Sequence, residues 1–573
     1  MIIAPLLLLP FAIALLLVSF MKSSKMIAYT SIGASLASLA MLPFLSFGTF
    51  AINWFSVGGF MFDIVSSVSS TNFVLLFIVL LLSPLIYTYS LGYFKQRSEF
   101  KRYYIEMLIF TMAMVAFAIA GNFILLFVAW EFLSITSYTL IGFWYKRRNA
   151  SLAARKAVTI VFIGDIALLA SIAIIWNFCS TLTFSSISTI PKSAVLLLII
   201  AILTKSAQFP FNEWLPDAME GPTPVSAYLH SATMVKAGVF AAIVLLPLFE
   251  RAHALAYFLV IGLFTAIIAT LNAMKETHVK RILAYSTVQE LGLMLSAVGI
   301  GAISAALYFF FAQAFYKALL FFSSGIMIDA NENENINSIY GLKKNKFVYI
   351  STLFGVLALA GFIPFDGFFS NVGLSSSFSK DLYAYILLSL ISVGTSFFIF
   401  RWLFVTSKDT NNRNVVVSYL AQPRSMLAST YLLAAFTLAA SVAFFYFPLL
   451  GYSISIKLDE AIIETLLVAI GLAISYFAYV RKKISIEAKI LEKIAYNSVF
   501  VNMFYEVLAK FAYLIGKGVE VFDLYINDLF DWIGHIVARL GDIGRVLVNG
   551  DVSFYALIMV VSLLAISALV LFV

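Results

Sequence analysis

Apolar segments long enough to cross a lipid bilayer recur along almost the whole of this 573-residue chain. A spanning helix needs about 20 apolar residues, and about 16 segments meet that length. They lie near residues 3–20, 26–46, 72–93, 103–119, 121–143, 155–176, 193–212, 224–249, 254–273, 281–299, 301–327, 348–374, 381–405, 427–449, 460–480 and 552–573. Only 12% of residues are charged, too few to cover a soluble fold. We predict an all-α polytopic membrane protein with an uncleaved first segment.

The basic residues are concentrated in alternate connections between these segments. They include Lys22, Lys25, Lys95, Arg97, Lys101, Arg102, Lys146, Arg147, Arg148, Arg155, Lys275, Lys280, Arg281, Lys343, Lys344, Lys346, Arg401, Lys408 and Arg413. Connections such as 47–71 carry few or none. The positive-inside rule then predicts that both termini lie outside and that residues 482–550 lie on the cytoplasmic side.

Several kinds of chemistry are excluded by what the chain lacks. Cys179 is the single cysteine, so an internal disulfide and a cysteine-ligated iron–sulfur cluster are excluded. The four histidines, at 230, 253, 278 and 535, are too dispersed in sequence for a metal site. No glycine-rich dinucleotide motif is present, and no basic cluster interleaved with aromatic residues indicates nucleic-acid binding. We therefore predict no cofactor and no metal in this chain, and no nucleic-acid partner.

The segment 500–548 differs in kind from the apolar spans. Its polar residues recur almost entirely at intervals of three, four or seven: Glu506, Lys510, Lys517, Glu520, Asp523, Asp528, Asp531, His535, Arg539, Asp542 and Arg545. This pattern predicts an amphipathic helix that would extend roughly 60 Å from Glu506 to Arg545. It is too polar to span, so we expect it along the membrane surface, as a lipid anchor or as a strut against neighbouring subunits. Its glycines, at 516, 518, 534, 541 and 544, are candidate bends.

Charged residues inside the apolar segments are the strongest functional signal. Each Asp, Lys or Arg at a helix centre costs about 2.5–3.5 kcal/mol, so such residues usually pair or line a wet path. The chain has eight notable ones: Glu131, Asp165, Lys205, His230, Lys236, Glu290, Lys317 and Asp366. Fixed ion pairs that hold helices together are one interpretation. A series of acids, lysines and a histidine that pass protons along the membrane is the other, and we favour it because a desolvated lysine releases its proton readily.

Two of the predicted helices contain a proline that interrupts them. The two sequences are alike, Phe209-Pro210-Phe211-Asn212 and Ile363-Pro364-Phe365-Asp366, and they lie an odd number of spans apart. Proline frees backbone carbonyls, which inside a membrane must be satisfied by protein or water. The pair is either two ordinary kinks or the mark of an inverted repeat with broken helices, as in transporters.

Four motifs resemble those of one family. WEFLSITSYTLIGFW, TKSAQFPFNEWLPDAMEGPTPVSAYLHSATMVKAGVF, KRILAYSTVQELG and AFYKALLFFSSG are similar to segments of the antiporter-like subunits of respiratory complex I and of Mrp-type sodium/proton antiporters. The likeness covers about residues 60–380 and is most specific at 204–240. It implies two inverted five-helix repeats, each with a broken helix.

The resemblance also implies roles for individual residues. Glu131 is expected to pair with Lys205 on the broken helix, His230 to link the two halves, and Lys317 to serve the second half. Asp165 matches a family aspartate. Three departures stand out: Asn371 where a lysine is common, Gln313 where a histidine is common, and the Mrp-like Lys236. Asp366 or Glu290 is then the candidate substitute for the missing lysine.

We expect six regions in the chain: residues 1–100, N-terminal helices; 101–250 and 251–405, the two repeats; 406–482, additional helices; 483–550, the lateral helix; and 551–573, the last span. A lateral helix before a last span resembles the distal, L-type complex I subunit. The resemblance therefore implies a proton-translocating, non-redox subunit of a complex I-like translocase in a prokaryotic plasma membrane.

The expected partners are the lipid bilayer, other membrane subunits contacted through the lateral helix, and redox subunits at a distance. The alternatives are the large subunit of an Mrp-type Na⁺/H⁺ antiporter and an inert membrane scaffold. The electron donor, the quinone and the choice between H⁺ and Na⁺ stay open.

Overall fold

A computed structural model describes residues 3–57, 60–94, 99–452, 456–481, 498–547 and 550–572. It divides into two units, Met1–Ser498 and Val499–Val573. Two of the predicted basic loop residues, Lys95 and Arg97, lie outside the described residues, as does the start of the predicted cytoplasmic segment at 482–497.

The first unit is a bundle of helices with one β-hairpin near its N-terminus. Its first half consists of η1 (Ala4–Leu8), α1 (Leu9–Phe20), α2 (Ser24–Met41), η2 (Leu42–Phe44), β1 (Gly48–Val57), β2 (Phe60–Val68), α3 (Ser70–Tyr93), α4 (Phe100–Ala118), α5 (Phe123–Ile141), α6 (Arg148–Cys179), η3 (Phe184–Ser186), α7 (Lys192–Lys205), α8 (Trp214–Asp217), η4 (Ala218–Glu220), α9 (Thr223–Ser231), α10 (Met234–Val244) and α11 (Leu246–Arg251). Its second half consists of α12 (Leu255–Lys275), α13 (Val279–Gly299), α14 (Ile303–Asn331), η5 (Ile336–Ser338), η6 (Leu342–Lys344), α15 (Lys346–Ala360), α16 (Asp366–Phe378), α17 (Leu382–Thr406), α18 (Arg413–Leu420), α19 (Arg424–Ala443), η7 (Phe444–Leu450) and α20 (Leu458–Tyr479).

The predicted apolar segments are helical. Among the described residues, 11 helices are long and apolar enough to cross a membrane, and shorter apolar helices lie at Ala4–Phe20, Lys346–Ala360 and Val552–Ile566. The chain is therefore an integral membrane protein of nearly all-α structure, as the sequence predicts. The total of about 16 spans and the inverted repeat stay predictions.

Both predicted breaks are present. α7 ends at Lys205 and α8 begins only at Trp214, while α15 ends at Ala360 and α16 begins at Asp366. The Phe209–Pro210 and Ile363–Pro364 peptide bonds within these breaks are cis. The first break starts inside the bundle, where Ser206 to Gln208 are buried and backbone groups must be satisfied by protein or water, whereas Phe362, Ile363 and Pro364 of the second break are exposed.

A third break was not predicted. The segment 224–249, expected to be one span, is divided into α9, α10 and α11, with the first interruption after Ser231. The Thr233 hydroxyl donates a hydrogen bond to the Tyr228 carbonyl over 2.7 Å, which ends the helix at this point. The break directly follows His230, one of the predicted site residues.

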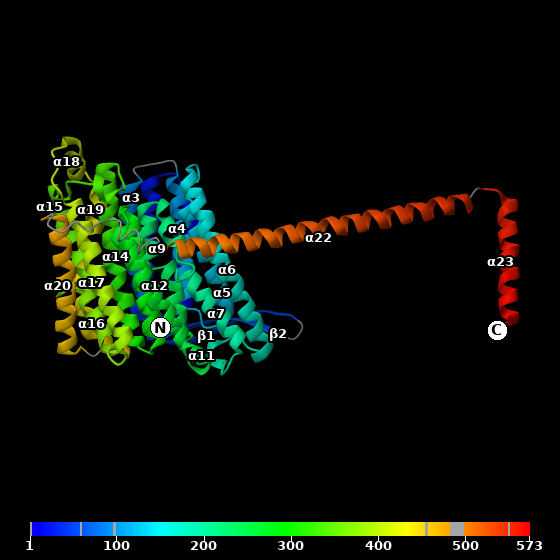
Figure 1. Cartoon of the computed structure of the whole chain (residues 1–573), viewed down its shortest axis with the longest axis horizontal. Coiled ribbons are helices and arrows are strands. Elements are labelled where there is room, and N and C mark those ends of the chain that lie inside the picture. Colours follow the sequence, from blue (N-terminus) through cyan, green and yellow to red (C-terminus); the bar gives the residue numbers. More distant parts are fainter. Residues whose placement is uncertain are drawn as a thin grey trace. The chain divides into compact units, whose positions relative to one another are not determined.

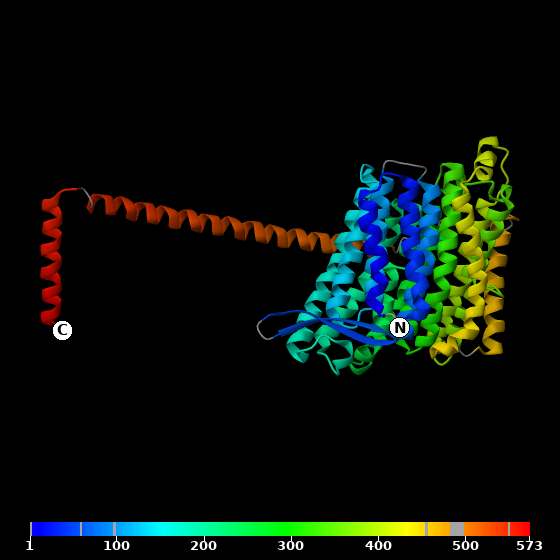
Figure 2. The ribbon, with the colours of Figure 1, turned by 180° about the vertical axis from the view of Figure 1, so that it is seen from behind.

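The β-hairpin is the exception to the all-α prediction. β1 and β2 pair antiparallel from Gly48 opposite Val68 to Val57 opposite Phe60. β2 also pairs with the chain before α5, since the Gly121 amide donates to the Val65 carbonyl over 2.8 Å. In Figure 2 the hairpin lies across the ends of neighbouring helices. Two strand-like runs joined by Gly-Gly are a hairpin signal, which a search for 20-residue apolar runs does not detect.

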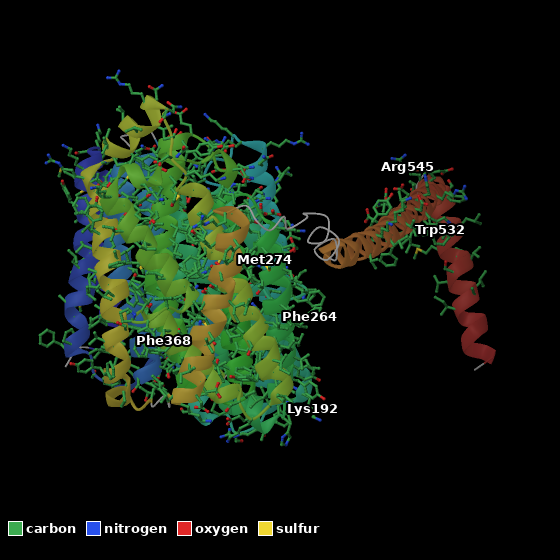
Figure 3. The ribbon with its side chains drawn as sticks, turned by 60° about the vertical axis from the view of Figure 1, so that its left-hand side comes forward. Lys192, Phe264, Met274, Phe368, Trp532 and Arg545 are labelled. Carbon is green, nitrogen blue, oxygen red and sulfur yellow. The ribbon has the colours of Figure 1, made fainter. Side chains whose placement is uncertain are left out.

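The helices of the first unit do not follow sequence order across the bundle, since α3 packs against α19 and α9 against α14. Figure 1 shows α5, α6 and α7 at one side, α17 and α20 at the other, and α14 between them. The apolar stretch of α14 is completely buried, so this helix forms the centre of the core. Figure 3 shows Phe264 and Met274 of α12 on an apolar flank and Lys192 at one end of the bundle.

Small residues allow the helices to approach closely, as is usual where lipid is the solvent. A Cβ atom on Gly262 of α12 would lie 2.4 Å from the Gly292 carbonyl oxygen of α13. These two helices therefore pack backbone against backbone.

The second unit contains two helices, α22 (Ser498–Leu547) and α23 (Val552–Phe572). α22 is a single helix of 50 residues, about 75 Å long at 1.5 Å per residue. Its glycines do not interrupt it. The predicted amphipathic helix is thus confirmed as a helix, while its position along the membrane stays a prediction.

Candidate functional site

Lys205 is the centre of a first buried cluster, at the end of α7. Its side chain is completely buried. Its Nζ donates to the Ser134 hydroxyl over 2.5 Å and to the Trp130 carbonyl over 3.1 Å, and lies 3.6 Å from Asp165 Oδ1. The indole of Trp130 donates to the same Asp165 oxygen over 2.6 Å. We call these four residues the first lysine site.

A glycine fixes the position of Asp165 within α6. A Cβ atom on Gly164 would lie 1.8 Å from the Thr204 hydroxyl and 3.3 Å from the Ala201 Cα atom. Because α6 and α7 approach this closely, the short side chain of Asp165 on α6 lies opposite Lys205 on α7.

The position of Glu131 differs from the expected one. The resemblance implied an ion pair between Glu131 and Lys205, but the carboxylate within 4 Å of Lys205 is that of Asp165. Glu131 follows Trp130 on α5 and is half-buried, facing partly outward. Consecutive side chains on a helix are rotated by about 100°, and Trp130 points inward toward Lys205. Glu131 therefore points in another direction and does not reach the lysine.

Lys317 is the centre of a second buried cluster, formed by α13 and α14. Its Nζ lies 3.0 Å from Glu290 Oε2 and donates to the Ser286 hydroxyl over 2.5 Å. The Tyr316 hydroxyl donates to Glu290 Oε1 over 3.1 Å. Both charged side chains are buried. We call Ser286, Glu290, Tyr316 and Lys317 the second lysine site.

Two further predicted residues lie between the clusters. Lys236 of α10 is fully buried and donates to the Phe310 carbonyl of α14 over 2.5 Å. His230 of α9 packs its ring 4.9 Å from that of Phe321, and neither ring nitrogen has a hydrogen-bond partner among the described residues. The charge of Lys317 acts on both side chains.

A backbone contact joins α10 to the first lysine site. The hydroxyl of Ser206, next to Lys205, donates to the carbonyl of Val235, next to Lys236, over 2.9 Å. Lys205, Lys236, His230 and Lys317 are thus all buried, but none of these hydrogen bonds joins one of the four side chains to another.

Asp366 lies at the second break, as the first residue of α16, and is completely buried. Its Oδ1 accepts from the Gly367 amide over 2.9 Å, and its Oδ2 has no hydrogen-bond partner in the described structure. The N-terminus of α16 favours a negative charge there. α16, which begins with Asp366, packs against α14, the helix that carries Lys317.

Sequence reasoning missed two buried acids on α20. Glu464 and Glu460 are both buried. Glu464 lies in the apolar run IIETLLVAIGL, so the criterion that selected Glu131 could have found it. Among the described residues, no three His, Cys, Asp or Glu side chains are grouped closely enough to hold a metal ion.

A bundle of membrane-spanning helices with buried lysine–carboxylate pairs is typical of one class, that of membrane proteins that move ions. A family model described as "NADH:quinone oxidoreductase/Mrp antiporter, TM" matches residues 120–398, which include all eight predicted site residues. The chain belongs to this family.

Two curated relatives illustrate the match. The chain is 33% identical over 504 residues to NADH-quinone oxidoreductase subunit L of Campylobacter jejuni subsp. jejuni serotype O:2, with 84% of each chain covered. It is 35% identical over 416 residues to NADH-ubiquinone oxidoreductase chain 5 of Arabidopsis thaliana. That second match covers 68% of this chain and 61% of the plant protein, which is less than two thirds of its length.

A solved structure shares the fold. The Mrp complex from Dietzia sp. DQ12-45-1b matches with a TM-score of 0.72 at 22% identity, over 99% of this chain and 63% of that one.

Proposed function

We propose that this chain is a proton-translocating membrane subunit of a complex I-like quinone oxidoreductase, in which partner subunits carry out the electron transfer. The observation that carries the proposal is the pair of buried lysine sites, Asp165–Lys205 at 3.6 Å and Glu290–Lys317 at 3.0 Å. The names of the curated relatives, subunit L and chain 5 of NADH–quinone oxidoreductases, support the same assignment.

The mechanism we propose is electrostatic. A lysine in each site holds a proton, and a carboxylate stabilises the charged form of that lysine. Adding or removing charge at one site changes the cost of charge at the next, because like charges in a poorly polarisable interior repel strongly. Lys236 and His230 would transmit this effect between Lys205 and Lys317, with water bridging the gaps at the helix breaks.

The roles of the remaining residues are part of the proposal. Asp165 is the counter-charge of Lys205, and Glu290 is that of Lys317. Glu131 would act on the first site from a distance, and Asp366 on the second. The six regions expected from the sequence, including the two repeats, are retained as proposals.

Partners and cofactors follow from this assignment. Other membrane subunits are expected neighbours, and α22 is proposed to contact them along its length. The chain itself would hold no cofactor, and the cofactors of electron transfer would reside in distant subunits. A prokaryotic plasma membrane is the proposed location.

Isolation of the native assembly tests the proposal. The chain is tagged, the membranes are solubilised gently, and the co-purifying proteins are identified by mass spectrometry. We expect subunits bearing iron–sulfur clusters and a quinone site, and sodium-independent proton uptake when the assembly is reconstituted into liposomes and reduces quinone. Small membrane subunits without any redox protein, together with sodium-coupled proton movement, would instead make this chain an antiporter subunit.

A further inference from the structure

We infer that Glu464 of α20 is the proton carrier that follows Glu290, and that it passes protons to Glu460 at the end of the bundle where α20 begins. This inference rests on the proposed function and extends its path beyond the second lysine site. It concerns a part of the chain outside the residues matched by the family model, 120–398.

Glu464 is a buried acid without a cation beside it. Its side chain is 2% exposed. Its Oε1 accepts from the Ser392 hydroxyl over 2.5 Å, and its Oε2 lies 3.4 Å from the Ser375 hydroxyl. In the described part of the chain, no lysine, arginine or histidine lies within 4 Å of it. An acid placed this way inside a membrane is costly, and such residues usually mark ion pathways.

A narrow cavity connects Glu464 to the second lysine site. Glu290 and Glu464 both line it, from α13 and α20 respectively, and Asn371, Ser375 and Ser392 lie along it. Asn371 and the two serines can each donate and accept a hydrogen bond. Glu290 and Glu464 are the charged residues of this lining.

One residue that lines the cavity has a buried polar atom that a water molecule would bind. Gln289 is 1% exposed, and its Nε2 donates to the Thr395 hydroxyl over 2.5 Å. Its Oε1 is buried without a hydrogen-bond partner among the described residues. A buried acceptor without a partner is unfavourable, and a water molecule in the cavity would satisfy it. Water there would also bridge Glu290 and Glu464 for proton transfer.

The path continues from Glu464 to the end of α20. Glu460 precedes it by one helical turn, about 6 Å along the axis, and accepts from the Tyr385 hydroxyl over 2.7 Å. Three residues further toward the N-terminus, Lys457 is exposed, and its Nζ lies 3.3 Å from the Ser379 hydroxyl. The acids therefore lead from the buried cavity to the end of the bundle. The positive-inside rule assigns that end to the outer side, because the loop before α19 is basic.

Charge substitutions in the reconstituted assembly test the inference. Glu464→Gln removes the proton-carrying group with little change in volume, and Glu464→Asp keeps it. Thr465→Val is the matched control, since among the described residues the Thr465 hydroxyl bonds within α20, to the Ala461 carbonyl at 2.8 Å. Lys317→Met serves as the comparison for the proposed function itself. Proton translocation per quinone reduced is measured for each variant, at low and at high sodium concentration.

We expect E464Q to lower proton translocation at least about tenfold, E464D to restore part of it, and T465V to match the unaltered assembly. Equal rates for E464Q and T465V, with K317M inactive, would overturn this inference alone. Unchanged translocation in K317M would overturn the proposed function. Recovery of E464Q by high sodium would make Glu464 part of a cation site and would also overturn the inference.

A chemical test on the unaltered assembly covers the case in which E464Q does not assemble. A hydrophobic carbodiimide reacts with protonated carboxyl groups in membranes. We expect it to modify Glu464, detected by mass spectrometry, and to inhibit proton translocation in proportion. Inhibition without modification of Glu464, or modification without inhibition, would contradict the inference.

Discussion

The two lysine sites use the same residue types but differ in how closely the charges meet. In the second site Lys317 touches its carboxylate directly, at 3.0 Å from Glu290. In the first site Lys205 is closer to two neutral oxygens, those of Ser134 and Trp130, than to Asp165 at 3.6 Å. The Asp165 carboxylate instead accepts a hydrogen bond from the Trp130 indole.

The two lysines also differ in their position within their helices. Lys205 is the last residue of α7, where the helix breaks, whereas Lys317 lies within the 29-residue α14. A helix end can shift without disturbing the rest of the helix, but a residue in the middle of a packed helix cannot. We therefore expect the charges of the first site to separate more easily than those of the second.

Removing the acid from each site gives the largest expected difference. Glu290→Gln strips Lys317 of its direct partner and leaves a buried lysine uncompensated, which costs about 3–5 kcal/mol. We expect proton translocation to fall at least roughly tenfold. Asp165→Asn should cost less, because Asp165 lies 3.6 Å from its lysine and Glu290 only 3.0 Å, and because Lys205 keeps two hydrogen bonds where Lys317 keeps one, to Ser286. The rate of proton uptake in liposomes measures both, and a larger loss for D165N than for E290Q would break the comparison.

The two helix junctions provide a second test, through glycines next to the buried acids. A Cβ on Gly367 would lie 1.7 Å from the Ala358 carbonyl oxygen, a backbone atom. A Cβ on Gly164 would first meet the Thr204 hydroxyl, at 1.8 Å, which can rotate away. Overpacking usually costs about 1–3 kcal/mol, and we expect Gly367→Ala to destabilise more than Gly164→Ala.

Thermal unfolding of the solubilised assembly measures this difference. Gly33→Ala is the control, because nothing lies within 4 Å of its Cβ position on α2. It should leave the unfolding temperature unchanged or raise it slightly. A greater loss for G164A than for G367A would show that the first junction is the more rigid of the two.

The smallest expected effect lies outside the membrane, at the loop that follows α14. Burial raises the pKa of Glu334, but hydrogen bonds and charge from His278 and Lys280 outweigh it and lower the pKa to about 2. The hydrogen bond to His278, at 2.8 Å, and the ion pair with Lys280, at 3.3 Å, therefore stabilise the fold above pH 4.5, and this contribution is lost as the pH falls from 4.5 toward 2. The carboxylate is 45% exposed, so the contribution is small.

Glu334→Gln should lower the unfolding temperature by roughly 1 °C at pH 7, and by less below pH 4.5. Differential scanning fluorimetry across this pH range measures it. Glu332→Gln, on an exposed neighbour in the same loop, is the matched control. A destabilisation of E334Q that grows as the pH falls would contradict the assignment of the sign.

Much of this architecture could be predicted from the sequence, because lipid imposes a simple rule on helix length. The apolar runs and the two prolines located the helices and two of their breaks. The β-hairpin and the break after Ser231 were missed because both depend on short polar or alternating patterns. Local hydrogen bonds, such as the one from the Thr233 hydroxyl to the Tyr228 carbonyl, determine where such breaks form.

The charged residues could be listed from the sequence, but not paired. A charge within an apolar run is conspicuous, and all eight predicted residues lie within one matched region. Which acid faces Lys205 depends on the close approach of α6 and α7 at Gly164, a tertiary feature that gives Asp165, rather than Glu131, the nearer position. Glu464 also stands in an apolar run and could have been listed by the same criterion, but its partners, Ser375 and Ser392, come from two other helices and could not have been predicted.

The central claim is that the buried lysines carry protons, and the proton-to-electron ratio tests it most directly. The assembly is reconstituted with Lys205→Met or Lys317→Met, each of which removes the proton-carrying group at similar volume. We predict that protons translocated per quinone reduced fall in both variants, or that quinone reduction slows in step with translocation, while the assembly remains intact. An unchanged ratio at an unchanged rate in both variants would contradict the account and leave the lysines as structural ion pairs.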